Sequence, residues 1–460
     1  MGLLDLPTET LGQICSHLCP HCVCPNFLPD LVPHGATSNT STAAAALCSL
    51  SRTCRLLCAL AQPLLYHDAA PRSAFRLLRT LVARPHLAAL VRGLRNDHGD
   101  STNPDPADVP AVADAAASRL GMGLPLYWME RPWDSFQPYV WEMLLGLTAP
   151  RLEALRYVFS RHDHVMLGNT LTGPGISKQR GGAVPFPRLR RLWIGYPNTE
   201  GRVYRGIDSL RPVLAAAPRL EALTACNCDG IGFGLPLAGL RELRFSRSFL
   251  KASDVTGALA ACPGLESFAY EWVGLAIRGT FAGIQPGQAW EALRTCAGTL
   301  RSLSLDFGDR PVAHEHLALH PRKKMGSLVE FRVLERLTVS PGVFTDDAGR
   351  VDRVGFHNST ELVQMLPPSL RVLSLPGNGD DEYKGPIQLV EAKRQGQFPH
   401  LVGIEVSAPE SVRERIAAAF AEVGVDFKVC GRSSRSGTDS SSAPSPSPYP
   451  FREDMPWPGY

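Results

Sequence analysis

The hexapeptide Leu300-Arg-Ser-Leu303-Ser-Leu305 decides the fold, because its spacing of apolar residues returns along most of the 460-residue chain. Apolar residues that alternate with other residues are typical of a β-strand with one buried face. The copies lie at 152–157, 189–194, 220–223, 240–245, 265–270, 300–305, 334–339, 370–375 and 401–406. We take 90–94 as a degenerate earlier copy. Their mean separation is about 31 residues, so the sequence predicts a repeated strand.

A predicted helix precedes each strand, and Pro or Gly often separates the two. Helix, turn and strand in this order resemble the unit of a leucine-rich-repeat horseshoe, in which strands line the concave side. We therefore predict an α/β fold: an irregular leucine-rich-repeat solenoid over 136–430, preceded by a helical linker and N-terminal cap over 69–135. An amphipathic helix at 410–422 and a last strand at 425–429 are expected to cap the solenoid.

The side chains between the inward leucines are expected to face the concave side, because strand residues alternate. We place six candidate target-binding residues on one ladder there: Arg191, Trp193, Glu242, Arg244, Ser304 and Arg336. An exposed Trp among Arg residues is a common binding anchor. The alternative is ordinary solvent-exposed strand surface.

A separate helical pattern occupies the N-terminus. Leu11, Ile14 and Leu18 follow at steps of three and four, after Leu6-Pro7-Thr8-Glu9, where Pro suits the first helical turn. Several prolines then predict an inserted loop over 19–46. A second continuous helix should reach residue 61, with Pro63 as its end. The sequence predicts a module of this kind over 1–68.

Both halves of this module together resemble an F-box of the fungal type. The matching residues are Leu6-Pro7-x-Glu9-x-Leu11-x-x-Ile14-x-x-x-Leu18 and then Leu47-x-x-Leu50-Ser51-Arg52-Thr53-Cys54-Arg55-x-x-x-x-Leu60-Ala61-x-Pro63-Leu64-Leu65-Tyr66. The insertion at 19–46 departs from the family pattern, which has a short turn there.

The resemblance implies a non-catalytic, substrate-recognition subunit of an SCF-type ubiquitin ligase. It would bind a Skp-type adaptor and, through that adaptor, the cullin and RING subunits, while the repeats hold an unknown target protein. The implied adaptor-binding residues are Leu6, Pro7, Glu9, Leu11, Ile14, Leu18, Leu50, Leu60 and Leu64. The alternative is a leucine-rich-repeat scaffold, outside the ubiquitin pathway, whose F-box-like segment is only a cap.

Composition sets further expectations. The net charge is +3 and the pI is near 8.3, so we expect no nucleic-acid partner. No apolar run approaches the ~18 residues of a membrane span. Asp5 and Glu9 do not fit a secretory signal, so the 12 Cys should be reduced thiols in the cytoplasm or nucleus. The Ser- and Pro-rich stretch 431–460 should be a disordered tail.

One cluster suggests a metal. Cys19, His21, Cys22 and Cys24 lie close together, and Cys19-x-x-Cys22 has the spacing of half a zinc site. No second Cys-x-x-Cys exists, so the expectation is no metal and no cofactor, with a structural zinc as the alternative. His314 to His320 lacks the metalloprotease spacing, and Gly168 to Lys178 lacks the ending of a phosphate loop. No sequence feature predicts an active site.

Overall fold

The computed structural model describes residues 2–23, 37–71, 73–95, 108–120, 144–158, 185–196, 206–232, 234–272, 283–307, 323–340, 343–344, 359–376, 384–406 and 410–429. The predicted tail at 431–460 and the segments 168–178 and 314–320 lie outside these residues.

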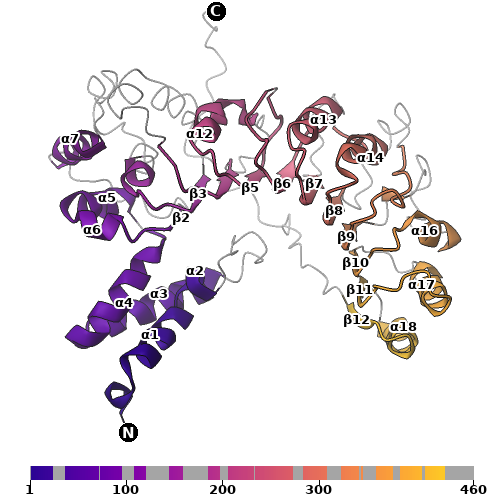
Figure 1. Ribbon diagram of the computed structural model, residues 1–460, viewed down its shortest axis with the longest axis horizontal. Helices are drawn as coiled ribbons and strands as arrows, with labels where there is room; N and C mark the ends of the chain where they lie inside the picture. The colour runs from indigo at the N-terminus through magenta and orange to yellow at the C-terminus, as the bar shows by residue number, and fades with distance from the viewer. Residues whose placement is uncertain are drawn as a thin grey trace, which may run out of the picture.

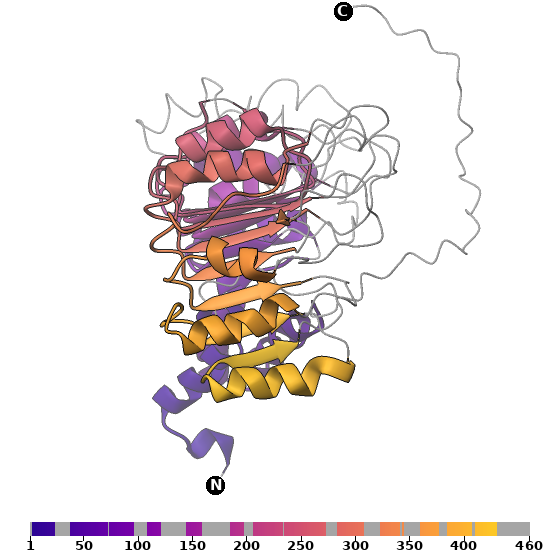
Figure 2. The same ribbon diagram turned by 90° about the vertical axis from the view of Figure 1, so that its right-hand side faces the viewer.

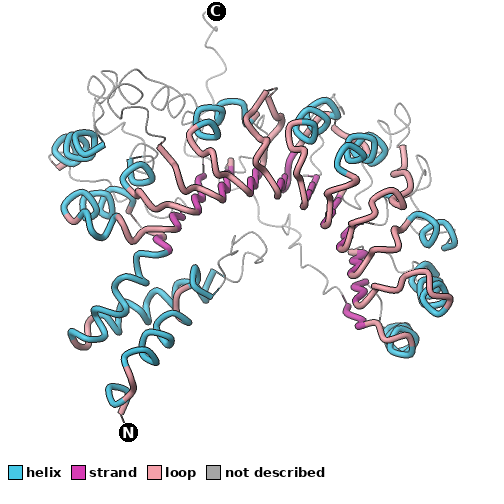
Figure 3. The backbone as a smooth tube through the Cα atoms, in the orientation of Figure 1, coloured by secondary structure: helices cyan, strands magenta, loops and turns pink. Residues whose placement is uncertain are grey.

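A curved parallel sheet organises the chain. Its twelve strands stand in sequence order, and each pairs in parallel with its neighbours. They are β1 Asp68–Ala69, β2 Gly93–Arg95, β3 Ala154–Val158, β4 Arg191–Gly195, β5 Ala222–Cys226, β6 Glu242–Ser248, β7 Ser267–Trp272, β8 Ser302–Asp306, β9 Arg336–Val339, β10 Val372–Leu375, β11 Gly403–Val406 and β12 Asp426–Val429. The strands line the inner side of an arch (Figures 1 and 3) and stack one above another in the turned view (Figure 2).

Helices cover the outer side of the arch (Figure 3). Parallel neighbours need a crossover connection, and helices supply it here. The helices and helical turns of this array are α5 Ala74–Ala83, α6 Pro85–Ala88, α7 Val109–Leu120, η4 Ile207–Leu210, α12 Arg211–Ala215, α13 Ala252–Ala260, α14 Pro286–Leu293, η5 Arg294–Cys296, α16 Ser359–Met365, α17 Lys384–Arg394 and α18 Glu410–Glu422. The chain is therefore a mixed α/β protein with a solenoid-like arrangement.

The sheet register explains the repeated motif. One ladder joins the second apolar residue of each copy and runs Leu94, Leu155, Leu192, Leu223, Leu243, Phe268, Leu303, Leu337, Leu373, Ile404 and Phe427. All but the last are buried, as is the leucine that opens each copy from Leu152 to Leu401. The strands predicted at the nine copies, the helix at 410–422 and the last strand are confirmed.

Four helices and a helical turn form a small module before the sheet: η1 Leu3–Asp5, α1 Thr8–His17, α2 Pro20–Val23, α3 Thr37–Ser51 and α4 Arg55–His67. We refer to 2–23 and 37–67 as the N-terminal module. It lies below the first strands in this view, and α4 leads directly into β1 (Figure 1).

Several boundaries predicted in the module are wrong. Residues 20–23 and 37–46, expected as loop, are helical, and Pro20 fits because it begins α2, where its missing N–H is not needed. The second helix is not continuous. The hydroxyls of Ser51 and Thr53 donate to the carbonyls of Cys48 and Leu50 at 2.8 Å, which closes α3. Pro63 lies inside α4 instead of ending it.

The sheet also begins earlier than 136. The pairs Asp68–Gly93 and Ala69–Leu94 join β1 to β2 within the predicted linker, and β2 matches the degenerate copy at 90–94. Asp68 and Arg95 form an ion pair of 2.8 Å with both side chains largely buried. This pair links the first two strands of the array.

Candidate functional site

The interior of the N-terminal module is small. Cys15, Leu47 and Ala61 are buried together, and partly buried leucines pack around them, including Leu18, Leu50, Leu60 and Leu64. These four leucines were predicted to contact an adaptor, but much of their surface is used within the module. The structure therefore places them mainly in the module's own core.

The remaining predicted adaptor residues divide by exposure. Leu11 is only 1% exposed and cannot contact a partner in this conformation, so its assignment to the binding surface is wrong. An amphipathic pattern predicts the apolar stripe of a helix, but it does not predict which residues at the edge of that stripe are exposed to solvent. Pro7 and Glu9 are exposed, Ile14 is 39% exposed, and Leu6 is intermediate.

Exposed apolar side chains concentrate near the start of the chain. Leu3 and Leu4 are 47% and 56% exposed, and sequence reasoning did not select them. Pro7 stands directly before α1, and Ile14 lies on α1. We call Leu3, Leu4, Pro7 and Ile14 the N-terminal apolar patch. This segment forms the end of the module away from the sheet (Figure 1).

The inner face of the sheet carries two ladders of outward side chains, not one. Arg191, Glu242 and Arg336 belong to the ladder of first strand residues. Two positions further along, Trp193, Arg244 and Ser304 belong to a second ladder. In full it runs Arg95, Arg156, Trp193, Thr224, Arg244, Ala269, Ser304, Thr338, Ser374, Glu405 and Lys428.

Side-chain size and charge change along this second ladder. Its first part consists of large basic or aromatic residues interrupted by the buried Thr224, and small residues occupy the middle from Ala269 to Ser374. The predicted residues Arg191, Glu242, Arg244 and Ser304 are partly exposed, and Arg336 is exposed. The inner face therefore carries larger, mostly basic side chains at one end and small side chains in its middle.

Trp193 is not the exposed anchor that the sequence predicted. It is 7% exposed, because the Arg156 guanidinium stacks 4.2 Å from the centre of its ring. Its ring also lies over Gly195, where an added Cβ would overlap it. Arg156 comes from the neighbouring strand β3, one residue after the buried Leu155. The repeat register predicts that Arg156 lies beside Trp193, but it does not predict that the guanidinium stacks on the ring.

A ladder of alternating charge precedes the strands. Arg92, Glu153, Arg190, Glu221, Arg241, Glu266, Arg301, Glu335 and Arg371 each stand directly before a strand. We call this series the Arg/Glu ladder. From Glu153 onward, the backbone N–H of each member donates to the carbonyl of the preceding member at 2.7–2.9 Å. Ion pairs join Arg92 to Glu153, Arg241 to Glu266 and Arg301 to Glu335 at 2.6, 3.0 and 2.7 Å.

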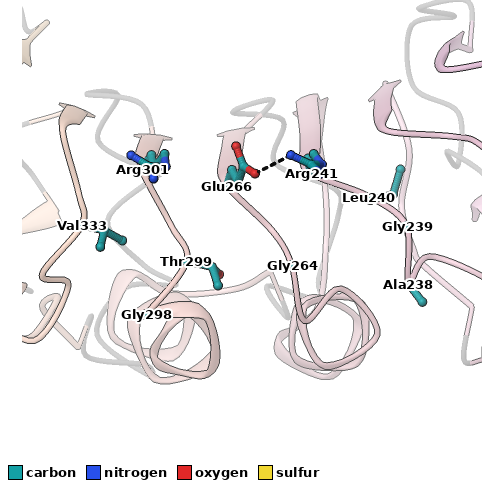
Figure 4. Close-up of a pocket in the computed structure, with 10 residues that line it drawn as sticks. All are labelled: Ala238, Gly239, Leu240, Arg241, Gly264, Glu266, Gly298, Thr299, Arg301 and Val333. Atoms are coloured by element: carbon teal, nitrogen blue, oxygen red, sulfur yellow. Dashed lines mark hydrogen bonds and ion pairs between the residues drawn. The ribbon is translucent and has the colours of Figure 1, made fainter.

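A pocket opens along this ladder. Arg241, Glu266 and Arg301 stand side by side above it (Figure 4), and its volume is about 500 Å³. Glycines and short side chains such as Ala238 and Thr299 form most of the remaining lining. Its three charged members take part in the ion pairs of the Arg/Glu ladder.

A Cys/His cluster lies within the module, next to the start of the sheet. The candidate ligand atoms of Cys19, His21, Cys22 and His67 all lie within 4.8 Å of one another. Cys22 Sγ is 3.6 Å from Nδ1 of His67. His67 ends α4 and was absent from the predicted set, because only the packing of the helices brings it there. Cys24 lies outside the described residues.

Burial controls the chemistry of this cluster. It raises the pKa of the Cys19 thiol to about 12, and the thiol donates to the Leu64 carbonyl at 3.7 Å. Burial, with His21 and Arg92 nearby, lowers the pKa of His67, which favours the neutral imidazole. His21 Nε2 is 3.8 Å from Oε2 of Glu153, and its Nδ1 is buried without a hydrogen-bond partner.

Comparison with known proteins adds no identification. No protein-family model matches the chain, and no curated protein matches its sequence. Among the described residues, no helix combines the length and the apolar character needed to cross a membrane.

Proposed function

We propose that the chain is a substrate-recognition adaptor of an SCF-type ubiquitin ligase. In this proposal the N-terminal module is an F-box that binds a Skp-type adaptor, and through it the cullin and RING subunits. The curved array is a leucine-rich-repeat solenoid that holds a target protein. The chain would act by proximity, because a bound target is held at high effective concentration near the ubiquitin-conjugating enzyme.

The N-terminal apolar patch is the observation that carries the proposal. Among the described residues, three of the nine large apolar side chains that are exposed belong to this patch, namely Leu3, Leu4 and Ile14, and two more, Val23 and Leu56, lie elsewhere in the N-terminal module. Clustered exposed apolar side chains mark interaction sites. The F-box-like residues Pro7 and Ile14 fall within this patch, which supports an adaptor contact there.

The arrangement of the array supports the second half of the proposal. Among the described residues, the helices of the array lie on its outer side (Figure 3), and the outward side chains on the inner face change from mostly basic to small along the sheet. Extended concave surfaces of this kind are the binding faces of repeat proteins. We place target binding on the residues around Arg191, Glu242, Arg244, Ser304 and Arg336. Trp193 would act by holding Arg156 in place.

A pair of matched variants tests the adaptor contact. Ile14→Glu introduces a charge into the patch, whereas Ile387→Glu changes an isoleucine on α17 that is also 39% exposed. Hot-spot residues contribute about 2 kcal/mol or more, so Ile14→Glu should weaken retention of a purified Skp-type adaptor by at least tenfold. Ile387→Glu should leave retention unchanged.

Two outcomes would contradict this function. One is a folded full-length chain that does not retain the adaptor. The other is equal retention by the two variants, which would place any binding elsewhere. Either result would favour the alternative of a repeat scaffold outside the ubiquitin pathway, in which the module serves only as an N-terminal cap.

A further inference from the structure

We propose that Cys19, His21, Cys22 and His67 bind one zinc ion, which links α2 to the end of α4 next to the start of the sheet. The inference concerns the chain's own architecture and does not depend on the ligase proposal. It completes a ligand set that the sequence leaves open, since the fourth ligand comes from the far end of α4.

The ligand types and their spacing fit a structural zinc site. Structural sites are tetrahedral, with sulfur at ~2.3 Å and nitrogen at ~2.0–2.1 Å. A sulfur and a nitrogen in that geometry are about 3.5 Å apart, and Cys22 Sγ and His67 Nδ1 are 3.6 Å apart. Two thiolates and two imidazoles close the coordination sphere, so the site has a structural character and no open position for catalysis.

The second imidazole shows an unsatisfied atom. Nδ1 of His21 is buried without a hydrogen-bond partner, and a buried polar atom is costly unless it is paired. Its other nitrogen, Nε2, faces Oε2 of Glu153 at 3.8 Å. A carboxylate beside the outer N–H is the usual way to orient a metal-bound histidine. Nδ1 is then the nitrogen that ligates the ion.

Glu153 is itself held in place. Arg92 donates to its Oε1 at 2.6 Å, and both residues belong to the Arg/Glu ladder before β2 and β3. The proposed site therefore touches α2 through Cys22 and His21, α4 through His67, and the sheet through Glu153. Binding forms two Zn–S and two Zn–N bonds and releases the thiol protons of Cys19 and Cys22 to solvent.

Metal content of the full-length chain tests the proposal. After expression with zinc and dialysis, elemental analysis should find one zinc per chain. Cys22→Ser and His67→Ala should each lose most of the bound zinc. Cys58→Ser is the matched control, because Cys58 is a partly exposed free thiol on α4 outside the cluster, and it should retain the metal. Cys24→Ser should also retain it.

Cobalt provides a readout that does not depend on stability. Co²⁺ added to the metal-free chain should give the intense visible bands of tetrahedral coordination and a thiolate charge-transfer band. At Co²⁺ concentrations that saturate the weakened site, Cys22→Ser should reduce the charge-transfer band by about half, since one of two thiolates is lost. Glu153→Gln should leave the spectrum intact and lower zinc affinity by about tenfold or more, the usual effect of removing an orienting carboxylate.

Three results would overturn the site. They are a folded wild-type chain that binds neither zinc nor cobalt, an octahedral cobalt spectrum, and full zinc retention in both Cys22→Ser and His67→Ala. Loss of zinc in Cys24→Ser with retention in His67→Ala would instead assign the ion to the inserted segment and reject the four ligands proposed here.

Discussion

The N-terminal module and the array bury apolar residues on very different scales. The interior cluster of the module consists of Cys15, Leu47 and Ala61 with partly buried leucines around it. The array contains one continuous cluster that extends from Ala69 to Val425. The module also carries most of the exposed large apolar side chains among the described residues.

The difference shows how each region is stabilised. Each unit of the array packs on its neighbours, so stability accumulates along the sheet. A helical unit of the module's size has little buried area of its own, and such units usually need a metal or a partner. The proposed zinc site would bind the metal, and the N-terminal apolar patch would bind the partner.

The sharpest test of this comparison is a pair of core truncations. Phe268→Ala removes a ring in the middle of the sheet, 6.5 Å from the ring of Phe245, and should cost about 3–5 kcal/mol. Hydrogen exchange should then accelerate across β6 to β8 and neighbouring units, with the module unaffected. Leu47→Ala should accelerate exchange in the module alone.

Ser304→Ala serves as the control, because Ser304 lies on the inner face outside the core, and its exchange pattern should match the wild type. If Leu47→Ala accelerated exchange in β6 to β8, the two regions would unfold as one unit. The difference between the small core of the module and the continuous core of the array would then not correspond to a difference in their stability.

A second prediction concerns pH and the array alone. Burial, together with Asp254 and Asp208, raises the pKa of Asp229 to about 6, although Lys251 opposes the shift. The folded state thus binds the proton of Asp229 more tightly than the unfolded state does. The stabilisation that this protonated carboxyl contributes is lost as pH rises from about 4 to 6. Asp229→Asn should therefore stabilise the array by about 1 kcal/mol at pH 7, after allowance for partial exposure.

Urea unfolding at two pH values measures this effect. The difference between Asp229→Asn and wild type should vanish near pH 3, where both side chains are uncharged. A constant difference at both pH values would show that Asp229 acts through packing or hydrogen bonding, and not through its charge.

The smallest predicted effect tests the Arg/Glu ladder. Glu335→Gln removes the 2.7 Å pair with Arg301 and should cost about 0.5 kcal/mol, as for other exposed pairs. The double exchange Arg301→Glu with Glu335→Arg keeps that pair but sets each new charge beside a like charge, at Glu266 and Arg371. It should be less stable than wild type at low salt, and the difference should disappear in high salt.

If the double exchange matched the wild type at low salt, the members of the ladder would act only as isolated pairs. The ladder would then not couple neighbouring units of the array.

The sequence predicted the array well because one signal is repeated many times. The spacing of Leu300, Leu303 and Leu305 sets which face of a strand is buried, and the parallel register follows from copies of similar shape. Helix boundaries that depend on one or a few residues were predicted less well. Arg52 to Cys54 breaks a helix that apolar spacing alone makes continuous, and the packing of α4 accommodates Pro63 within a helix.

The candidate sites depended on contacts between distant residues, which explains the errors there. Trp193 is covered by Arg156 from another strand, and Leu11 faces the interior of the module. His67 is 45 positions from Cys22, so local spacing could not reveal it as a fourth candidate ligand. The alternation of Arg and Glu before the strands is present in the sequence. It predicts ion pairs only once the strand register shows that these residues are neighbours.

That alternation also constrains how the gene for this chain can change in length. Recombination that deletes or duplicates a single unit joins two arginines or two glutamates at the new boundary, from Arg92 through Arg371. A change of two units preserves the order of charges. Relatives that differ in length within this stretch are therefore expected to differ by even numbers of units, or to carry compensating charge reversals where they do not.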